Sequence, residues 1–313
     1  MTTTTLPDNL TMRPATEDDV PAIVAGVIAE EIAEMGKSDT TADEINELWT
    51  DEETDLLNDT RVLLTAEGQV IGYVGISASD HGFMLDPHMH VRVQYRGLEQ
   101  RLLQFAEQRV RERVADDPSL ASNIWTYSFS PTRTALLKEE GYTVVSSDYR
   151  MQIILHDAPP TPTLLDGIAI RSYIPGQDER AIYNAVQEAF PDFTGHPYRP
   201  FEEWEDGVLK RSSFDPTLLF VAVAGNEIVG VVICRAYPDV HLGFINQVAV
   251  LRSWRKRGIA LQLLFTAFGA YYRRGMTDVI LDVDTHNATG AHELYRRAGM
   301  RQIMQVDQME KAL

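Results

Sequence analysis

Residues 248–260 read V-A-V-L-R-S-W-R-K-R-G-I-A: an apolar strand that ends at Val250, a basic turn and the first residues of an apolar helix. A strand followed by a turn whose amides open a helix can bind an anion, because the unpaired N–H groups and the helix dipole both favour negative charge. Gly258 lets the backbone approach a ligand closely, and the small side chain of Ala260 leaves room in the first helical turn. The stretch therefore predicts an anion site at the start of a helix over 259–272.

The turn concentrates positive charge in an acidic chain. It holds no acid and four cations, namely Arg252, Arg255, Lys256 and Arg257, whereas the whole chain has a formal net charge of −18. This local reversal of sign indicates a polyanionic ligand. The same pattern also fits a strand–helix junction with a solvated basic face, because glycine-bearing turns are common.

A second stretch downstream favours the ligand-binding interpretation. Residues 278–284, D-V-I-L-D-V-D, read as a strand, and Asn287 is then predicted to cap a helix that ends at Gly299. With this helix in place, the chain resembles the GNAT acyltransferases, the Gcn5-related N-acetyltransferase superfamily.

Two motifs carry the resemblance. Arg255-x-x-Gly258-x-Ala260 matches the pyrophosphate signature Q/R-x-x-G-x-G/A of that family. Asn287 and the run L-Y-R-R-A-G-M at 294–300 match its second motif, with Met in place of the final Phe. Either motif alone would be a weak signal, but both occur in the family's order and separation.

The resemblance implies the fold, the donor and the donor's contacts. The fold is α/β, a twisted mixed β-sheet flanked by helices, in which strands 243–250 and 278–284 separate and admit the pantetheine arm of acetyl-CoA. A backbone amide near Ala249 and Val250 would lie against the thioester carbonyl, as in an oxyanion hole. The residues that would hold the donor are Val248, Ala249, Val250, Arg255, Lys256, Arg257, Gly258, Ile259, Ala260 and Asn287.

The resemblance also places Tyr295 where it can protonate the departing thiolate, although a core aromatic on an amphipathic helix is the alternative. An amine acceptor is mostly protonated at neutral pH and needs a general base. Many relatives use a glutamate on the strand before the turn, but G-F-I-N-Q-V-A-V at 243–250 has no acid. Asp282 and Asp284 share one face of the next strand, so either is a candidate base, directly or through water, or a solvated strand-end carboxylate. His286 is a further candidate.

These expectations describe an enzyme that transfers an acetyl group from acetyl-CoA to a primary amine of a small molecule, by direct attack of the amine on the thioester. The acceptor pocket in this fold is usually roofed by the segment after the first helix, here residues 190–204. That segment mixes aromatics with Asp192, His196, Glu202 and Glu203, which could hold an amine or only pack a Pro-rich loop. Two other functions stay open: a non-catalytic acyl-CoA-binding regulator and a protein-lysine acetyltransferase.

The chain contains an internal repeat. Landmark residues of the first half recur 158 positions later (171 − 13); the pairs are Arg13 and Arg171, Gly72 and Gly230, and Gly141 and Gly299. Both halves have an apolar hairpin, at 61–76 and 218–234, and three prolines mark a linker at 156–167. We expect two tandem GNAT-like α/β domains, a degenerate one over 1–156 and a catalytic one over 157–313.

The first half keeps the pattern of the fold but not its polar groups. Gln94 and Gly97 are allowed equivalents of the turn residues, whereas Glu99, Phe129 and Leu137 stand where the second half has donor-binding or catalytic side chains. A carboxylate in the first helical turn suits the bare dipole but repels a pyrophosphate. The first domain is therefore predicted to be catalytically silent.

Composition narrows the cellular role. No apolar run is long enough to span a bilayer, and the start of the chain lacks the layout of a signal peptide. The single cysteine, Cys234, lies in an apolar strand, which predicts a buried thiol, no disulfide and a cytoplasmic location. The acidic balance argues against nucleic acid as a partner. We expect no metal, no membrane partner, and a monomer or homodimer.

Overall fold

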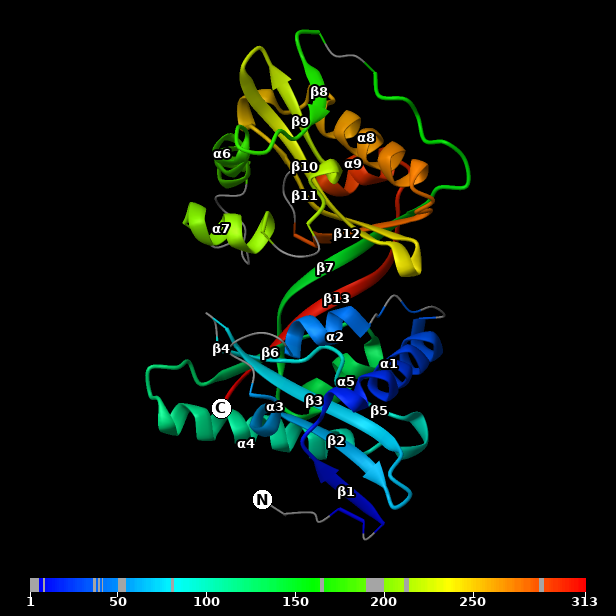
Figure 1. Ribbon diagram of the computed structural model, residues 1–313, viewed down its shortest axis with the longest axis vertical. Helices are drawn as coiled ribbons and strands as arrows, with labels where there is room; N and C mark the ends of the chain where they lie inside the picture. The colour runs from blue at the N-terminus through cyan, green and yellow to red at the C-terminus, as the bar shows by residue number, and fades with distance from the viewer. Residues whose placement is uncertain are drawn as a thin grey trace. The chain divides into compact units, whose positions relative to one another are not determined.

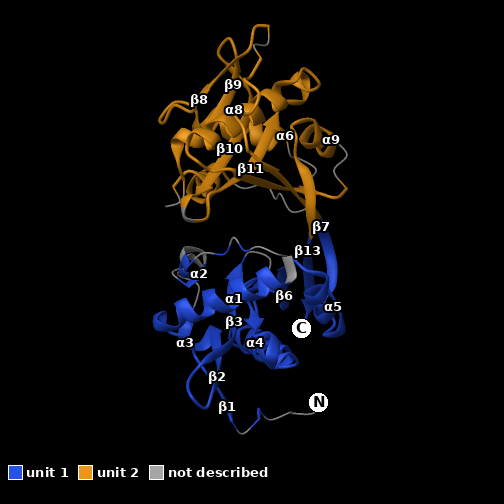
Figure 2. Cartoon of the chain, turned by 90° about the vertical axis from the view of Figure 1, so that its right-hand side faces the viewer, with its two compact units in different colours: residues 1–147, 306–313 blue, residues 148–305 orange. Residues whose placement is uncertain are grey.

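The computed structural model describes residues 6–7, 9–35, 38, 40, 42–49, 55–79, 82–163, 166–189, 200–210, 214–286 and 290–313. The chain divides into two compact units, coloured blue and orange in Figure 2. Unit 1 comprises residues 1–147 and 306–313, and unit 2 comprises residues 148–305.

Unit 1 is a mixed sheet flanked by helices (Figure 1). Its strands run in the order β1-β2-β3-β4-β6-β13, with β5 paired to β3; β4 and β6 are parallel. The strands are β1 (Leu10–Arg13), β2 (Thr60–Thr65), β3 (Val70–Ser79), β4 (Gly82–Leu85), β5 (His90–Val91), β6 (Asn123–Ser128) and the end of β13 (Arg301–Ala312). The helices are α1 (Val20–Met35), α2 (Ala42–Trp49), α3 (Leu56–Asp59), α4 (Glu99–Asp116) and α5 (Pro131–Glu139).

Unit 2 repeats this plan. Its strand order is β7-β12-β11-β10-β9-β8, and the parallel pair is β11 and β12. The strands are β7 (Thr143–Ile154), β8 (Ala169–Ser172), β9 (Leu219–Ala224), β10 (Glu227–Tyr237), β11 (Leu242–Val250) and β12 (Asp278–Asp284). The helices are α6 (Glu179–Ala189), α7 (Phe201–Val208), α8 (Ile259–Arg273) and α9 (Ala291–Arg297). The predicted mixed α/β fold is confirmed, as are both hairpins and the helix after the basic turn.

The same ion pair joins β1 in unit 1 and β8 in unit 2 to the residue just before the helix that follows. Arg13 donates from Nη1 and Nη2 to the carboxylate of Asp19 at 2.6 and 2.8 Å. Arg171 donates to Asp178 in the same bidentate way at 2.5 and 2.9 Å. In both units the hydrogen bond from the arginine lowers the pKa of the aspartate. The repeat seen in the sequence therefore extends to individual side-chain contacts.

Strands β7 and β13 each begin in one unit and end in the other. In unit 2, β7 pairs antiparallel with β12 from Ile154 opposite Asp278 to Asp148 opposite Asp284. In unit 1, the end of β13 pairs antiparallel with β6 from Asp307 to Ala312. The boundary expected between residues 156 and 157 describes the sequence repeat and stays a proposal, whereas the contacts divide the chain after Ser147 and after Gln305.

The core of unit 2 lies between the sheet and α8. A β-carbon at Gly230 would meet Ile259 and Leu263 of α8 at 3.1 and 3.2 Å, and one at Gly243 would meet the Tyr271 ring at 2.7 Å. Only glycine therefore lets α8 pack this closely on β10 and β11. Cys234, 1% exposed, is the buried thiol that was predicted, and burial raises its pKa to about 12. Within the described residues, no helix is long and apolar enough to cross a membrane.

Candidate active site

The start of α8 is open to a ligand. Gly258 is the residue before the helix and has φ of +83°, a conformation that favours glycine, and no described side chain caps the helix. The first amides of an uncapped helix have no partner within the helix. Together with the helix dipole they attract an anion, as the sequence predicted.

The cations around this turn differ in their contacts. Lys256 and Arg257 are exposed, and the Arg257 guanidinium lies 4.5 Å above the Trp254 ring. Arg255 instead donates from Nε to the carbonyl of Val250 at 3.1 Å and from Nη2 to the carbonyl of Ala189 at 3.0 Å. Its guanidinium thus ties the turn to the ends of β11 and α6, and its predicted contact with a pyrophosphate stays a prediction.

Strands β11 and β12 separate beside this turn. Their parallel pairing covers three register pairs and ends at Phe244 opposite Ile280. On the other side of β11, the N–H of Leu251, the residue after the strand, donates to the Val229 carbonyl of β10 at 3.0 Å. N–H groups alternate in direction along an antiparallel strand. The Val250 N–H therefore points away from β10, into the gap that β12 leaves, where the sequence analysis placed an oxyanion hole.

A β-bulge brings two amide side chains to one face of β11. Ile233 of β10 is opposite Gln247, but the next residue, Cys234, is opposite Ile245, so Asn246 is the extra residue. Gly243 faces α8, because a β-carbon there would meet Tyr271. Val250 also faces α8, because it pairs with Gly230, which lies against the same helix. Alternation from both ends then puts Asn246 and Gln247 together on the opposite face, the side covered by α6 and α7 (Figure 1).

The predicted bases lie on this same face. Asp282 forms a bidentate ion pair with Arg150 of β7, at 2.9 and 3.0 Å, so both of its oxygens are engaged. Asp284 accepts from the His286 N–H at 2.6 Å through one oxygen. Asp148 of β7, which no sequence pattern singled out, lies opposite Asp284. Burial, and then the charges of Asp282 and Asp284, raise the pKa of Asp148 to about 6.

The predicted acid lies on the opposite face. Tyr295 of α9 is 8% exposed and belongs to the core beneath α8 and α9. Burial raises its pKa to about 12. The cap predicted for this helix is wrong: α9 begins at Ala291 behind Gly290, whose φ of +80° turns the chain into the helix. Asn287 itself lies outside the described residues.

Only part of the predicted acceptor roof is described. Residues 190–199, including Asp192 and His196, lie outside the described residues. The rest forms α7, where Trp204 is 3% exposed and packs against Tyr183 of α6, with ring centroids 5.6 Å apart. The indole Nε1 of Trp204 is buried and has no hydrogen-bond partner among the described residues.

In unit 1 two side chains near the corresponding positions bond to the protein's own backbone. The Glu99 carboxylate, in the first turn of α4, accepts from the Gly97 N–H at 2.5 Å. The parallel pairing of β4 with β6 ends at Met84 opposite Trp125, and beyond this strand gap Arg133 of α5 donates to the carbonyl of Met89 at 2.6 Å. The corresponding residue of unit 2, 158 positions later, is Ala291, whose short side chain cannot make this contact. The turns before the two helices also align differently from the sequence prediction. The Arg96 N–H donates to the Val93 carbonyl as the Arg255 N–H donates to the Arg252 carbonyl, so Arg96 rather than Gln94 corresponds to Arg255.

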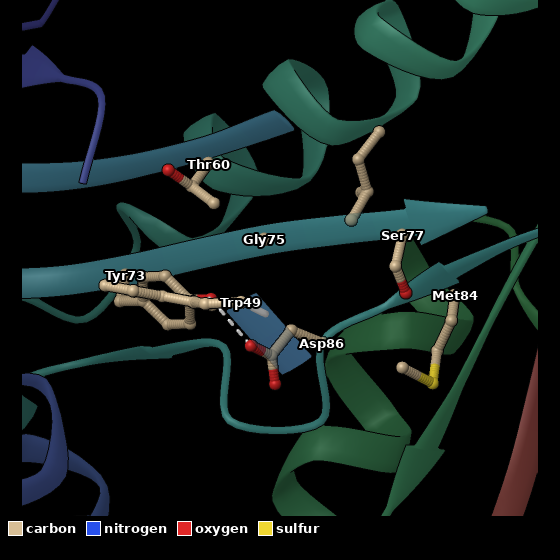
Figure 3. Close-up of a pocket in the computed structure, with 8 residues that line it drawn as sticks. Trp49, Thr60, Tyr73, Gly75, Ser77, Met84 and Asp86 are labelled. Carbon is tan, nitrogen blue, oxygen red and sulfur yellow. Dashed lines mark hydrogen bonds between the residues drawn. The ribbon is translucent and has the colours of Figure 1, made fainter. Parts of the chain in front are cut away.

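Side chains of unit 1 also bond to one another around a small pocket (Figure 3). Trp49 donates to the Tyr73 hydroxyl at 2.8 Å, and this hydroxyl donates to Asp86 at 2.7 Å. The other oxygen of Asp86 accepts from the His88 N–H at 2.8 Å. Both Asp86 oxygens therefore accept hydrogen bonds from residues of unit 1 itself. The pocket around them is also lined by Thr60, Gly75, Ile76, Ser77 and Met84.

Comparisons with known proteins agree with this geometry. Residues 180–300 match the model of the Acetyltransferase (GNAT) family. A GCN5-related N-acetyltransferase from Sphaerobacter thermophilus is similar over 98% of this chain and 96% of that one, with a TM-score of 0.82 and 34% identity. A tandem GNAT protein from the clavulanic acid biosynthesis pathway shares the fold over 96% of this chain and 98% of that one, with a TM-score of 0.76 and 13% identity. A mycothiol acetyltransferase of Thermomonospora curvata is 29% identical over 247 residues, which cover 76% of this chain and 78% of that protein.

Fold and site together define an acyltransferase, built on a fold that generally binds an acyl-CoA. The chain belongs to the GCN5-related N-acetyltransferase family, as a member with the tandem layout. The residues of unit 2 fit such a donor: an uncapped helix start, exposed cations and a backbone amide at the gap between β11 and β12.

Proposed function

We propose that this protein is an acetyl-CoA-dependent N-acetyltransferase that acts on a primary amine of a small molecule, with its active site in the C-terminal half. The contrast between the two helix starts carries the proposal. Neither helix has a side-chain cap, but Glu99 in the first turn of α4 holds its carboxylate against the Gly97 N–H just before that helix, whereas the first turn of α8 has no acid. Only the second half can therefore receive the phosphates of a CoA thioester without displacing a carboxylate.

Bound acetyl-CoA would supply a thioester whose carbonyl carbon accepts the amine. The amides that open α8, with Lys256 and Arg257, hold the phosphates, and the Val250 N–H stabilises negative charge on the carbonyl oxygen. Tyr295 keeps its proton at neutral pH, because burial raises its pKa to about 12, and can give it to the leaving sulfur. Donor and leaving group are thus served from the α8 and α9 side of the sheet, which leaves the α6 and α7 side for the acceptor.

Relatives support a small-molecule acceptor. The mycothiol acetyltransferases that this chain resembles are named for a small thiol, and the 29% identical relative covers 76% of this chain. The absence of an acid on β11, where Phe244 lies nearest the expected glutamate, leaves the particular acceptor amine open.

A matched pair of variants tests the donor site. Gly258→Asp puts a side chain and a negative charge into the α8 turn, so calorimetric titration with acetyl-CoA should show at least a hundredfold weaker binding. Gly97→Asp makes the same change in unit 1, where a β-carbon meets nothing within 4 Å, and should leave binding unchanged. Unchanged affinity in Gly258→Asp, with the fold intact by circular dichroism, would contradict the proposal.

The amine is tested with the full chain and acetyl-CoA. Glucosamine, cysteine amide, putrescine and a lysine-containing peptide are offered as acceptors, and acetylated products are counted by mass spectrometry. We expect turnover of a small amine. Binding of acetyl-CoA with no acetylated product would indicate the acyl-CoA-binding regulator, and acetylation of the peptide alone would indicate the protein-lysine acetyltransferase.

A further inference from the structure

Buried polar atoms without partners gather on one side of the unit 2 sheet. They are Asn246 Oδ1 and Gln247 Oε1 of β11, with Trp204 Nε1 of α7, and none of them has a partner among the described residues. Folded proteins pair nearly all such atoms, so an unpaired group in a native fold requires an explanation. A ligand that brings hydrogen-bond donors to β11 would provide the missing partners.

The bulge in β11 makes these two amides neighbours. Without an extra residue, Asn246 and Gln247 would point to opposite faces of the strand. With it, both point toward the α6 and α7 layer, beside the part of β11 that no longer pairs with β12. The unpaired oxygens therefore lie at the opening between the strands, where the acceptor must approach the donor.

Two carboxyl groups face each other on the same side of the sheet. Asp148 and Asp284 are directly opposite in the antiparallel pair of β7 and β12, which brings cross-strand side chains to about 5 Å between β-carbons. The Asp148 carboxyl is half-buried, and no hydrogen bond is among the causes that shift its pKa. Like charges this close favour sharing one proton between them.

We propose that the acceptor binds on this face, donating hydrogen bonds to Asn246 and Gln247, and that its ammonium proton passes to the Asp148–Asp284 carboxyl pair. This inference rests on the proposed function and adds the acceptor side to it. Asp148 comes from the last strand of the first sequence repeat, so the site draws residues from both repeats. Asp282 has a different part, because Arg150 engages both of its oxygens.

The proton balance is complete with residues of this chain. The ammonium group loses one proton to the carboxyl pair, directly or through one water, and its nitrogen lone pair becomes available. The C–N bond forms as the C–S bond breaks, the sulfur takes the proton of Tyr295, and the amide nitrogen returns its second proton to that phenolate. The carboxyl pair then releases its proton to solvent.

The charges around Asp148 set its pH range. Asp284 is opposite it, and Asp282 and Arg150 lie two residues along their strands as an ion pair. His286 is exposed in the turn after β12, and His292 of α9 lies on the other face against Tyr149. Burial and the two carboxylates together raise the pKa of Asp148 to about 6, so the carboxyl pair can take a proton near neutral pH.

The pH dependence of turnover tests the carboxyl pair, with the best amine from the acceptor set. In the unmodified protein, kcat/KM for the amine should rise with pH through about 6. Asp148→Asn should lower kcat/KM by about a hundredfold and remove that limb, while KM for acetyl-CoA is unchanged. Asp278→Asn, on the same face of β12 but at its paired end, is the control and should keep the limb. A limb near pH 6 in Asp148→Asn would overturn the inference.

Stability separates catalysis from support of the fold. The pKa of Asp148 is raised on folding from an ordinary value of 3.8, so its contribution to stability is present at low pH and is lost as the pH rises through about 6. Asp148→Asn should therefore raise the Tm at pH 8 and leave it unchanged at pH 3. A lower Tm at pH 8, together with lower activity, would indicate a structural role and overturn the inference.

The amide pair is tested separately. Asn246→Leu and Gln247→Leu should each raise KM for the amine about tenfold with KM for acetyl-CoA unchanged, because each removes an acceptor of a charge-assisted hydrogen bond. Unchanged KM for the amine in both variants would overturn the amide part. No turnover of any amine by the unmodified protein would instead reject the proposed function, and this inference with it.

Discussion

At the scale of single residues, Tyr295 combines burial in the core with the proposed role of general acid. Its ring is 8% exposed and packs in the core of unit 2, so a purely structural role is the alternative. Desolvation disfavours the phenolate and raises the pKa to about 12. The hydroxyl has no hydrogen bond to a described residue, so its proton is available to a ligand.

Tyr295→Phe removes only the hydroxyl and keeps the ring. Turnover should fall on the order of a hundredfold, which is typical for loss of a general acid, with acetyl-CoA affinity intact and Tm nearly unchanged. Tyr271→Phe is the matched control: that hydroxyl lies 2.8 and 2.9 Å from the carbonyl oxygens of Arg235 and Phe244. The control should lose about 1 kcal/mol of stability and keep its turnover. The opposite pattern, stability lost and turnover kept in Tyr295→Phe, would assign Tyr295 to the core.

At the scale of secondary-structure elements, strand β7 explains what the sequence could and could not predict. The hairpins, the helix that begins at Ile259 and the strand Asp278–Asp284 follow from local patterns of apolar residues and turns, and all were predicted correctly. The partner of β7 did not follow, because alternation shows which residues share a face but not which strand lies beside them. Asp148 was missed for that reason alone.

Side-chain partners were equally hidden. Arg255 matches a ligand-binding signature, yet its guanidinium bonds to the carbonyls of Val250 and Ala189, which are distant from each other in sequence. Arg133 closes the gap in unit 1 through the carbonyl of Met89, a contact that no local pattern encodes. The cap at Asn287 was wrong because the preference of asparagine for helix starts does not fix where a helix begins, and α9 begins behind Gly290, which adopts a positive φ.

The pairing of β7 with β12 predicts which C-terminal fragment of the chain folds on its own. A fragment of residues 157–313 lacks the seven residues of β7, Asp148 to Ile154, that pair with β12, so β12 becomes an exposed edge. We expect this fragment to melt without cooperativity and to bind acetyl-CoA poorly. A fragment of residues 143–313 keeps β7 and should recover both properties. Thermal melts by circular dichroism and calorimetric titration compare the two; equal behaviour would show that β7 is dispensable to unit 2.

At the scale of the whole molecule, the two units share one fold but place their polar groups differently. In unit 1, Asp86 accepts hydrogen bonds from Tyr73 and His88, and Glu99 in the first turn of α4 accepts from the Gly97 N–H. In unit 2 the first turn of α8 has no acid, and amide oxygens on β11 have no partner among the described residues. Unit 1 also has buried polar atoms without a partner among the described residues, such as His90 Nε2 and Tyr142 Oη, so the acid at the start of α4 is the difference that favours donor binding in unit 2, as proposed.

This difference predicts one acetyl-CoA per chain. A pyrophosphate at α4 would meet the Glu99 carboxylate, and two unit charges 4 Å apart repel by about 4 kcal/mol at an effective dielectric of 20. Solvent and salt weaken this repulsion, because Glu99 lies at the surface. A remaining repulsion of about 1.4 kcal/mol would still weaken acetyl-CoA binding tenfold. Arg133 also bridges the strand gap there.

Equilibrium titration of the full chain with acetyl-CoA counts the sites, and we expect a stoichiometry of one that Gly258→Asp abolishes and Gly97→Asp preserves. Glu99→Gln removes the carboxylate's charge but leaves Arg133 across the gap, so it should not create a second site. A stoichiometry of two in the unmodified protein would contradict the prediction, and so would binding that survives Gly258→Asp but is lost in Gly97→Asp, because the donor would then occupy unit 1.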